Sequence, residues 1–270
     1  MNRQMSGLTF ILLAMLFALL ITSCTSSGVM YENEATATAQ AQRAVLQATA
    51  MAQSMQSTVQ ALDEDARATA AAREALFKSA AAWGVVHADG FESNEVNWFE
   101  GSDEDQELAQ ISWEIAGGKY IWQAEAYDGF IWWVVPDVEL VDDFYYSVTA
   151  HQSDGPETGE YGMVFRQSAL GSYYVFGINE TGQFSIYLFH DQQWKSLIDW
   201  SESTTIKTGA PNTLSVIAQD TIYYLFINGE QVGEFEDSRL TGGQVGLMIS
   251  LSDAGDMATW EFDDYELRAP

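Results

Sequence analysis

The sequence predicts an all-β protein, an antiparallel two-sheet sandwich, preceded by a long N-terminal α-helical stalk. Residues 29–83 contain neither Gly nor Pro and are rich in alanine, a composition that favours helix. After Trp83 the apolar residues alternate with a period of two or form short runs, which is typical of strands. Turn signals separate these segments, and no helical pattern lies between them. The pattern therefore predicts two packed antiparallel sheets.

The amino terminus resembles the leader of a bacterial lipoprotein. Arg3 supplies positive charge, and residues 8–21 form an almost unbroken apolar run that is short for a membrane span. The run ends in "ITSC", residues 21–24, which resembles a lipobox. This resemblance implies that residues 1–23 are a signal peptide and that Cys24, the only cysteine, is acylated. The alternatives are a stray or buried thiol and an uncleaved signal anchor.

Residues 24–82 are predicted to form an Ala-rich helical stalk or tether. A four–three spacing runs along it, which favours a loose coiled coil and self-association through the stalk helix. The alternative is a partly disordered tether rich in Ala, Thr and Gln. Either form would hold a domain away from a membrane. The stripe comprises Ala48, Ala52, Met55, Val59, Leu62, Ala66, Thr69, Arg73, Leu76 and Ala80.

Residues 83–270 form the predicted sandwich and carry almost the whole net charge of −28. Such an anionic surface repels nucleic acid and anionic lipid headgroups. Binding to DNA or RNA is therefore excluded, whereas neutral polyols, sugars and cations remain as partners. The basic residues of this region are Lys119, Arg166, Lys195, Lys207, Arg239 and Arg268.

Two long stretches carry the pattern of a known fold family. "TIYYLFINGEQVGEFEDSRLTGGQVGLMIS" (221–250) reads as strand, Asn-Gly, short strand, acidic turn and Gly-x-Val-Gly-Leu. "YGMVFRQSALGSYYVFGINETGQFSIYLF" (161–189) and the terminal "FDDYEL" fit the same family. They resemble the concanavalin A-like lectin/glucanase domains, which include laminin-G-like modules and family 16-like or 3-keto-disaccharide hydrolase-like domains. The resemblance, over about residues 89–268, implies a jelly-roll sandwich; it leaves function open, because this fold hosts lectins, hydrolases and adhesive modules.

The terminal "WEFDDYELRAP" (260–270) places Glu261, Asp263 and Glu266 at the spacing E-x-D-x-x-E. Laminarinase-like glycoside hydrolases carry nucleophile, helper and acid/base at this spacing. On a regular strand Glu266 faces away from the other two, so all three align only if a bulge shifts the register. In those hydrolases the motif lies in mid-chain, whereas here the sequence stops four residues later. We therefore expect a structural strand, with catalysis as the alternative.

The tryptophans are the first candidates for ligand contacts. Trp122, Trp132 and Trp133 fall in adjacent predicted strands. Trp132 and Trp133 are neighbours, so they face opposite surfaces of a sheet. One of them is expected in the core and the other toward solvent. The alternative is that most tryptophans fill the core, since each buries up to about 250 Å².

An arginine and two tyrosines are the second candidates. Arg166 is predicted to lie opposite Phe165, and an arginine among aromatic strands requires a carboxylate or planar acceptor. Tyr173 and Tyr187 alternate out of phase with the apolar residues of their strands, so Arg166, Tyr173 and Tyr187 are expected on one face. The alternative is a structural Arg–Asp pair on a solvated sheet. The predicted ligand-binding residues are Trp122, Trp132, Arg166, Tyr173 and Tyr187.

Two acidic clusters, "SDEDQE" (102–107) and "SDAGD" (252–256), could hold calcium, which requires six to eight oxygen ligands. The alternative is that both are solvated turns, and no other cofactor is expected. His87, His151 and His190 are scattered, and the H-E-x-x-H and G-x-S-x-G signatures are absent.

The sequence favours an extracytoplasmic lipoprotein, anchored by lipid to the bacterial cell membrane or outer membrane. Its sandwich is expected to bind a glycan or surface polysaccharide, or to act as an adhesive module. Two alternatives stay open. One is a glycoside hydrolase of the concanavalin A-like glucanase type, and the other is a non-catalytic protein-interaction domain on a stalk.

Overall fold

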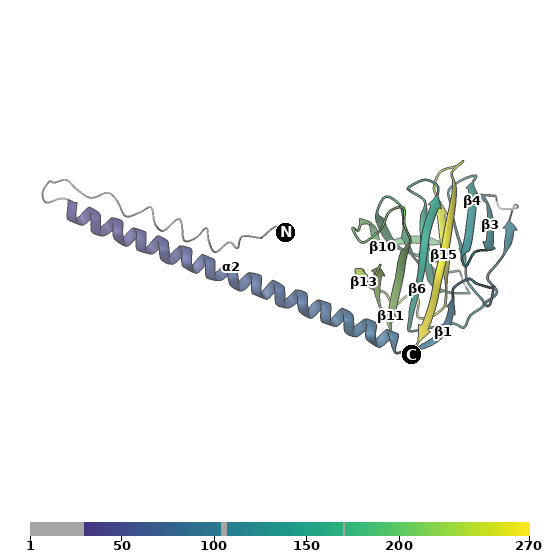
Figure 1. Cartoon of the computed structure of the whole chain (residues 1–270), viewed down its shortest axis with the longest axis horizontal. Coiled ribbons are helices and arrows are strands. Elements are labelled where there is room, and N and C mark those ends of the chain that lie inside the picture. Colours follow the sequence, from purple (N-terminus) through teal and green to yellow (C-terminus); the bar gives the residue numbers. More distant parts are fainter. Residues whose placement is uncertain (1–29, 104–106, 170) are drawn as a thin grey trace. The chain divides into compact units, whose positions relative to one another are not determined.

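The structure is a computed structural model that describes residues 30–103, 107–169 and 171–270, with side chains from residue 38 onward. These residues form one long helix and fifteen antiparallel strands arranged in two sheets (Figure 1). The predicted fold class, a two-sheet antiparallel sandwich preceded by a long helix, is confirmed.

Sheet A is the larger sheet, with the order β13-β12-β11-β6-β15-β4-β3-β2 and with β1 paired to β15. In Figure 1, β15 is the long yellow strand between β6 and β4. The strands of sheet A are β1 (Gly84–Asp89), β2 (Gly101–Asp103), β3 (Ala109–Ile115), β4 (Tyr120–Ala126), β6 (Phe144–Asp154), β11 (Asn212–Gln219), β12 (Ile222–Ile227), β13 (Glu230–Glu236) and β15 (Met257–Ala269).

Sheet B has the order β10-β9-β8-β7-β14-β5. Its central strands read as nearly continuous buried runs, which indicates that both of their faces are covered. The strands of sheet B are β5 (Phe130–Val134), β7 (Glu160–Gln167), β8 (Tyr173–Ile178), β9 (Gln183–His190), β10 (Gln193–Glu202) and β14 (Gln244–Leu251).

The main core lies between the two sheets and is rich in aromatic rings. Alternate residues of each strand point inward, as the period-two pattern predicted. On β15, for example, Trp260, Phe262 and Leu267 are fully buried. Phe262 packs on Trp122 of β4 with ring centroids 5.4 Å apart. Such inward alternation on both sheets produces one continuous hydrophobic layer.

The helix α2 runs from Met30 to Ala81 and ends in a tight turn, in which Ala82 and Trp83 donate to carbonyls three residues earlier. Near the middle of the helix, Met55, Val59 and Leu62 of the predicted stripe are 64–71% exposed. The predicted self-association would use these residues. No helix within the described residues is long and apolar enough to span a membrane.

The chain divides into two compact units, Met1–Ala68 and Thr69–Pro270. The second unit therefore contains the last three turns of α2 together with the sandwich. In this unit Leu76, Phe77 and Ala80 pack on an apolar patch of sheet A, and the Phe77 ring lies 4.3 Å from that of Phe226. The covered patch comprises Tyr145, Ile217, Tyr224 and Phe226.

Polar contacts reinforce this junction. Arg73, which interrupts the apolar stripe, forms an ion pair with Glu230 of β13. Arg268 of β15 donates to the carbonyl oxygens of Ala81 and Trp83, where the helix has no further donors of its own. The carboxy-terminal strand thereby caps the end of α2.

Candidate functional site

The outer face of sheet B is largely apolar, because alternate residues of its central strands point away from the core. Val164, Tyr173, Val175 and Met248 form this layer and are at most 2% exposed. Trp133 of β5 packs on the same layer, with its ring centroid 4.4 Å from that of Tyr173. This part of the face is therefore covered by the protein's own side chains.

Beside this layer lies an open groove of about 430 Å³. All six strands of sheet B contribute to it, so a ligand in the groove would touch side chains from the whole sheet. Its lining contains aromatic, aliphatic, hydroxyl and carboxyl groups. The lining residues are Gly129, Phe130, Ile131, Glu160, Val175, Tyr187, Trp194, Ser250, Leu251 and Ser252.

Aromatic rings form one side of the groove. Trp194 of β10 is 49% exposed, yet other rings hold it in place. Its ring centroid lies 5.9 Å from that of Tyr173, 6.4 Å from Tyr187 and 5.0 Å from Phe189. Edge-on and tilted contacts of this kind stabilise aromatic clusters. The groove therefore offers an accessible indole in a fixed position.

Glu160, the first residue of β7, brings a carboxyl group into the groove. Gly177 of β8 makes room for it, because a methyl group at that position would overlap Glu160 Oε1. Ser185 Oγ of β9 donates a 3.4 Å hydrogen bond to the same oxygen. Burial raises the pKa of the Glu160 carboxyl to about 7, and the bond from Ser185 opposes this only in part. The groove thus contains a carboxyl group that changes charge near neutral pH.

The phenol of Tyr187 lies near this carboxyl group. Burial raises the pKa of Tyr187, and the negative charges of Glu160 and Asp199 raise it further, while a hydrogen bond with Ser196 lowers it. The phenol therefore stays neutral at physiological pH. A neutral hydroxyl both donates and accepts hydrogen bonds, so Tyr187 adds a second polar group beside Glu160.

Two of the predicted binding residues lie on this outer face. Tyr173 and Tyr187 alternate out of phase with the core residues of β8 and β9, as expected. Tyr187 lines the groove. Tyr173, in contrast, is only 2% exposed, and its ring packs against those of Trp133 and Trp194. Their role in binding stays a prediction.

Arg166 does not share this face, and that expectation is wrong. Its φ of 51° breaks the strand alternation, and β7 bulges against β14 at this point. The side chain turns inward and is 1% exposed. It donates to the carbonyl oxygens of Leu240 and Asp220, and its guanidinium carbon lies 5.0 Å from the centre of the Tyr223 ring. Arg166 is therefore a structural residue between the sheets.

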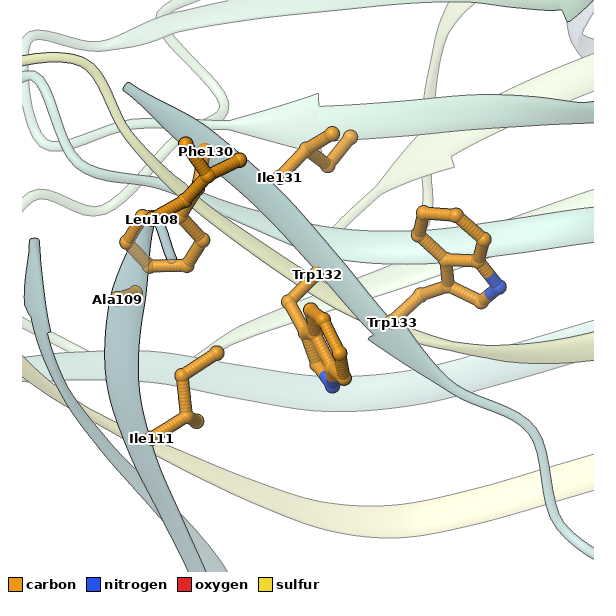
Figure 2. Close-up of a pocket in the computed structure, with 7 residues that line it drawn as sticks. All are labelled: Leu108, Ala109, Ile111, Phe130, Ile131, Trp132 and Trp133. Atoms are coloured by element: carbon orange, nitrogen blue, oxygen red, sulfur yellow. The ribbon is translucent and has the colours of Figure 1, made fainter. Parts of the chain in front are cut away.

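Trp132 and Trp133 point to opposite sides of β5, as predicted (Figure 2). Trp133 is the outward one, whereas Trp132 packs toward the core beside Trp113, with ring centroids 6.2 Å apart. Trp132 lines a smaller apolar pocket of about 260 Å³ between β3 and β5. Its lining residues are Leu108, Ala109, Ile111, Phe130, Ile131, Trp132 and Trp133.

Trp122 is a core residue. It is fully buried and packs against Trp113, Tyr120 and Phe262 at centroid distances of 5.4–6.0 Å. The assignment of Trp122 to a binding surface is therefore corrected, because its side chain faces the opposite sheet and not solvent.

The three carboxylates of the terminal motif lie on the outer face of sheet A. Asp264 has a φ of 50°, and the pairing of β15 with β6 shifts register between Asp263 and Glu266. This bulge is the one that the spacing required. Glu261, Asp263 and Glu266 consequently all lie at partly exposed positions, between the buried residues of β15.

Basic residues neutralise two of these carboxylates. Lys119 forms an ion pair with Glu261, and Arg268 donates to Glu266 from 2.5 Å. His151 Nδ1 lies 4.0 Å from Glu261 as well. None of these carboxylates lines the groove of sheet B or the pocket beside β5. The surroundings are those of a paired, solvated strand, and catalysis by this motif stays untested.

The remaining predicted sites concern lipid and metal. Cys24 and residues 104–106 of the first acidic cluster lie outside the described residues. The second cluster, residues 252–256, forms a mostly exposed turn at the start of β15. Within the described part of the chain, no group of three or more His, Cys, Asp or Glu residues is arranged to hold a metal ion.

Sequence reasoning missed Glu160 and Trp194 as site residues. Trp194 carries a usable signal, because it follows the tight turn after β9 on a strand whose residues are mostly polar. Glu160 carries none, since its position depends on Gly177 of the neighbouring strand. The space that Gly177 leaves for Glu160 joins two neighbouring strands, so only the folded sheet reveals it.

Several solved structures of other proteins are similar to this one in fold. No known family model matches the chain, and no curated protein is significantly similar to it. Among solved structures, carbohydrate-binding module CBM66 from Bacillus subtilis is similar over 69% of this chain and 95% of its own, with 17% identity and a TM-score of 0.47. The catalytic domain of an endo-1,3-β-glucanase (laminarinase) from Thermotoga petrophila RKU-1 is similar over 69% of this chain and 98% of its own, with 7% identity and a TM-score of 0.49.

A third similar structure is the GlcNAcα1-4Gal-releasing endo-β-galactosidase from Clostridium perfringens. It has 10% identity and a TM-score of 0.52, over 70% of this chain. The chain spans 63% of that protein's length, just under two thirds. At such identities the likeness concerns the fold alone. The expected concanavalin A-like lectin/glucanase fold is thereby confirmed.

Proposed function

We propose that the sandwich is a carbohydrate-binding module whose ligand lies in the groove of sheet B. One observation carries this proposal: an exposed, fixed indole and a carboxyl group line the same groove, which crosses all six strands. Pockets of this kind combine an apolar wall with a few placed polar groups.

The groove offers what a sugar ring requires. The apolar C–H face of a sugar can pack on Trp194, in the way that other apolar groups pack on an indole. The hydroxyl groups of the sugar need hydrogen-bond partners once they lose water. Glu160 and Tyr187 supply such groups at the edge of the aromatic wall. The carbohydrate-binding and glycan-cleaving proteins that share this fold agree with the proposal.

Hydrolysis is the second candidate, and one observation favours it. A carboxyl group with a pKa of about 7, as in Glu160, has the protonation behaviour of a general acid. Glycoside hydrolysis also requires a second carboxylate, about 5–5.5 Å away for retention or about 6.5–9.5 Å for inversion. Glu160 is the only carboxyl group among the described lining residues of the groove. Binding is therefore the first proposal.

The test is glycan binding by the full-length protein and two variants. Trp194→Ala should weaken binding about tenfold or more, because it removes the exposed aromatic surface. Trp200→Ala is the matched control, since Trp200 is also exposed on β10 but does not line the groove. A glycan array followed by calorimetry measures both.

Three outcomes decide between the candidates. Selective loss in Trp194→Ala without sugar release supports a binding module. Sugar release that disappears in Glu160→Gln would establish hydrolysis instead. If no glycan binds, or if both tryptophan variants bind like the wild type, the groove proposal fails and a protein partner becomes the leading explanation.

The proposal places this module on the outside of a bacterial membrane. Acyl chains on Cys24 would anchor it, and α2 would serve as the spacer. The lipobox resemblance of "ITSC" supports this part. Metabolic labelling with a palmitate analogue should mark the wild type, and Cys24→Ser should lose the label and leave the membrane fraction. A Cys24→Ser variant that stays in the membrane would point to an uncleaved signal anchor.

A further inference from the structure

The carboxyl group of Glu160 has no basic partner. Among residues 38–103, 107–169 and 171–270, no lysine, arginine or histidine forms an ion pair with it. The hydroxyl of Ser185 donates a hydrogen bond to it. The lining of the groove likewise contains no basic residue. The negative charge of Glu160 is therefore available to a cation that belongs to a ligand.

A second negative charge lies close by. The carboxylates of Glu160 and Asp199 both act on the phenol of Tyr187. The ring of Tyr187 meets that of Trp194 edge-on, with centroids 6.4 Å apart. Glu160, Tyr187 and Trp194 all line the groove, and the charge of Asp199 acts on it through Tyr187.

We infer that the glycan bound in this groove carries a free amine, as in a de-N-acetylated amino sugar, and that its ammonium group binds Glu160 in the groove that Tyr187 and Trp194 also line. This inference rests on the proposed carbohydrate-binding function and names the class of ligand. It disfavours uronic acids and sulfated sugars, whose anions would meet a carboxyl group without a basic partner.

An ammonium group matches both parts of the site. It has three donors and no acceptor, so it satisfies a carboxylate and neighbouring hydroxyls. Aromatic faces also attract cations, most strongly when the cation loses water, and Trp is the best of them. Glu160 is a partly buried carboxyl group without a counter-ion, so an arriving cation would supply the partner that the chain does not provide. The net charge of −28 favours the approach of cations as well.

The protonation behaviour of the site agrees with this. The raised pKa of Glu160, about 7, reflects burial without a compensating charge. A bound ammonium would lower that pKa, because a neighbouring positive charge favours the ionised carboxylate. On binding, the proton that Glu160 loses would pass to the amine where the amine is unprotonated, and to solvent where it is already charged. Tyr187 and Asp199 are the other titratable groups at this end of the groove.

The experiment compares matched oligosaccharide pairs that differ only in N-acetylation, such as glucosamine and N-acetylglucosamine hexamers. Calorimetry at about pH 7 and about 0.15 M salt limits long-range attraction. The wild type should bind the amine form about tenfold or more tightly than the acetylated form. Glu160→Gln should abolish this preference while keeping the folded structure, because the amide has the shape of the carboxyl group.

A charge-matched control separates the site from the general field. Asp191→Asn makes the same change in net charge, and Asp191 has a side chain that is 86% exposed on the β9–β10 turn, outside the groove lining. It should keep the amine preference. Calorimetry in two buffers of different ionisation enthalpy measures the number of protons exchanged on binding, which should differ between the wild type and Glu160→Gln because only the wild type has the Glu160 proton to lose.

The outcomes keep the two proposals distinct. Equal binding of both forms, lost in Trp194→Ala but unchanged in Glu160→Gln, overturns the amine inference and leaves the carbohydrate-binding proposal standing. Amine binding that falls equally in Glu160→Gln and Asp191→Asn overturns the inference too, since it reflects net charge alone. If neither form binds, and no other glycan does, both proposals fail.

Discussion

The carboxylates on the outer faces of the two sheets differ in whether a basic side chain pairs with them. On sheet A, Glu261 is paired with Lys119 and Glu266 with Arg268. On sheet B, Glu160 has only a long hydrogen bond from Ser185. A paired carboxylate on a strand is usually structural, whereas an unpaired one in a groove is a candidate for function. The presence or absence of a basic partner therefore distinguishes a structural carboxylate from a candidate functional one better than sequence spacing does.

The apolar parts of the two faces differ in the same way. On sheet A the residues around Phe226 are covered by Leu76, Phe77 and Ala80 at the end of α2. On sheet B, Trp194 is held by other rings but remains half exposed. The chain covers the apolar patch of sheet A with its own helix, whereas on sheet B it leaves the indole of Trp194 accessible. Four predictions would break or sharpen this comparison.

The largest effect is expected at the covered face. Phe226→Ala removes a fully buried ring that packs on Phe77, so it should lower the free energy of unfolding by about 3–5 kcal/mol. Urea denaturation measures this change. Trp194→Ala, on the accessible face, should cost less, about 1–2 kcal/mol, because half of the indole is already exposed. Equal losses in the two variants would contradict the division into a covered and an accessible face.

The second effect concerns the room that Gly177 leaves for Glu160. Gly177→Ala places a methyl group against Glu160 Oε1, which should displace the carboxyl group and cost about 1–3 kcal/mol of stability. Glycan binding should fall although the net charge is unchanged. Gly182→Ala would only test backbone strain, because that turn residue has a φ of 81° and no atoms near its Cβ position. Unchanged glycan binding in Gly177→Ala would show that the position of Glu160 is unimportant.

The third effect is a pH dependence of stability. The pKa of Glu160 is about 7 in the folded protein and about 4.5 as its reference value. Between these values the folded state binds more protons than the unfolded state, so stability should fall as pH rises from about 4.5 to about 7. Above that range the contribution is constant. Glu160→Gln should lack this component when unfolding curves of both proteins are compared across the range, and parallel pH profiles would argue against it.

The smallest effect is expected at the terminal motif. Glu261→Gln removes a partly exposed ion pair with Lys119, which should change stability by less than about 1 kcal/mol. Glycan binding and any sugar release should be unaffected. If the wild type releases sugar and this variant does not, catalysis by the terminal motif on sheet A would be supported instead.

Much of the fold follows from periodicity in the sequence. The period-two segments correspond to strands, and Asn228-Gly229 forms the predicted turn between β12 and β13, with both φ values positive. The bulge needed to align Glu261 with Glu266 is present as well. These features depend on neighbours along the chain, which is why a sequence pattern reveals them.

The site was less predictable, because its features depend on contacts between strands. Alternation showed that Trp132 and Trp133 face opposite sides, but not which of them faces the core. Arg166 turned inward because a bulge and a positive φ interrupt its strand. Glu160 lies where it does because Gly177, on another strand, has no side chain. Register between distant segments decides each of these positions.

The cap that Arg268 provides has a mechanical consequence. Tension transmitted through α2 would reach the sandwich at Gly84, where β1 pairs with the last residues of β15. Pulling there would tend to peel β1 away one hydrogen bond at a time. The docked end of the helix packs on sheet A and is held to β15 through Arg268, so these contacts would have to break along with that ladder.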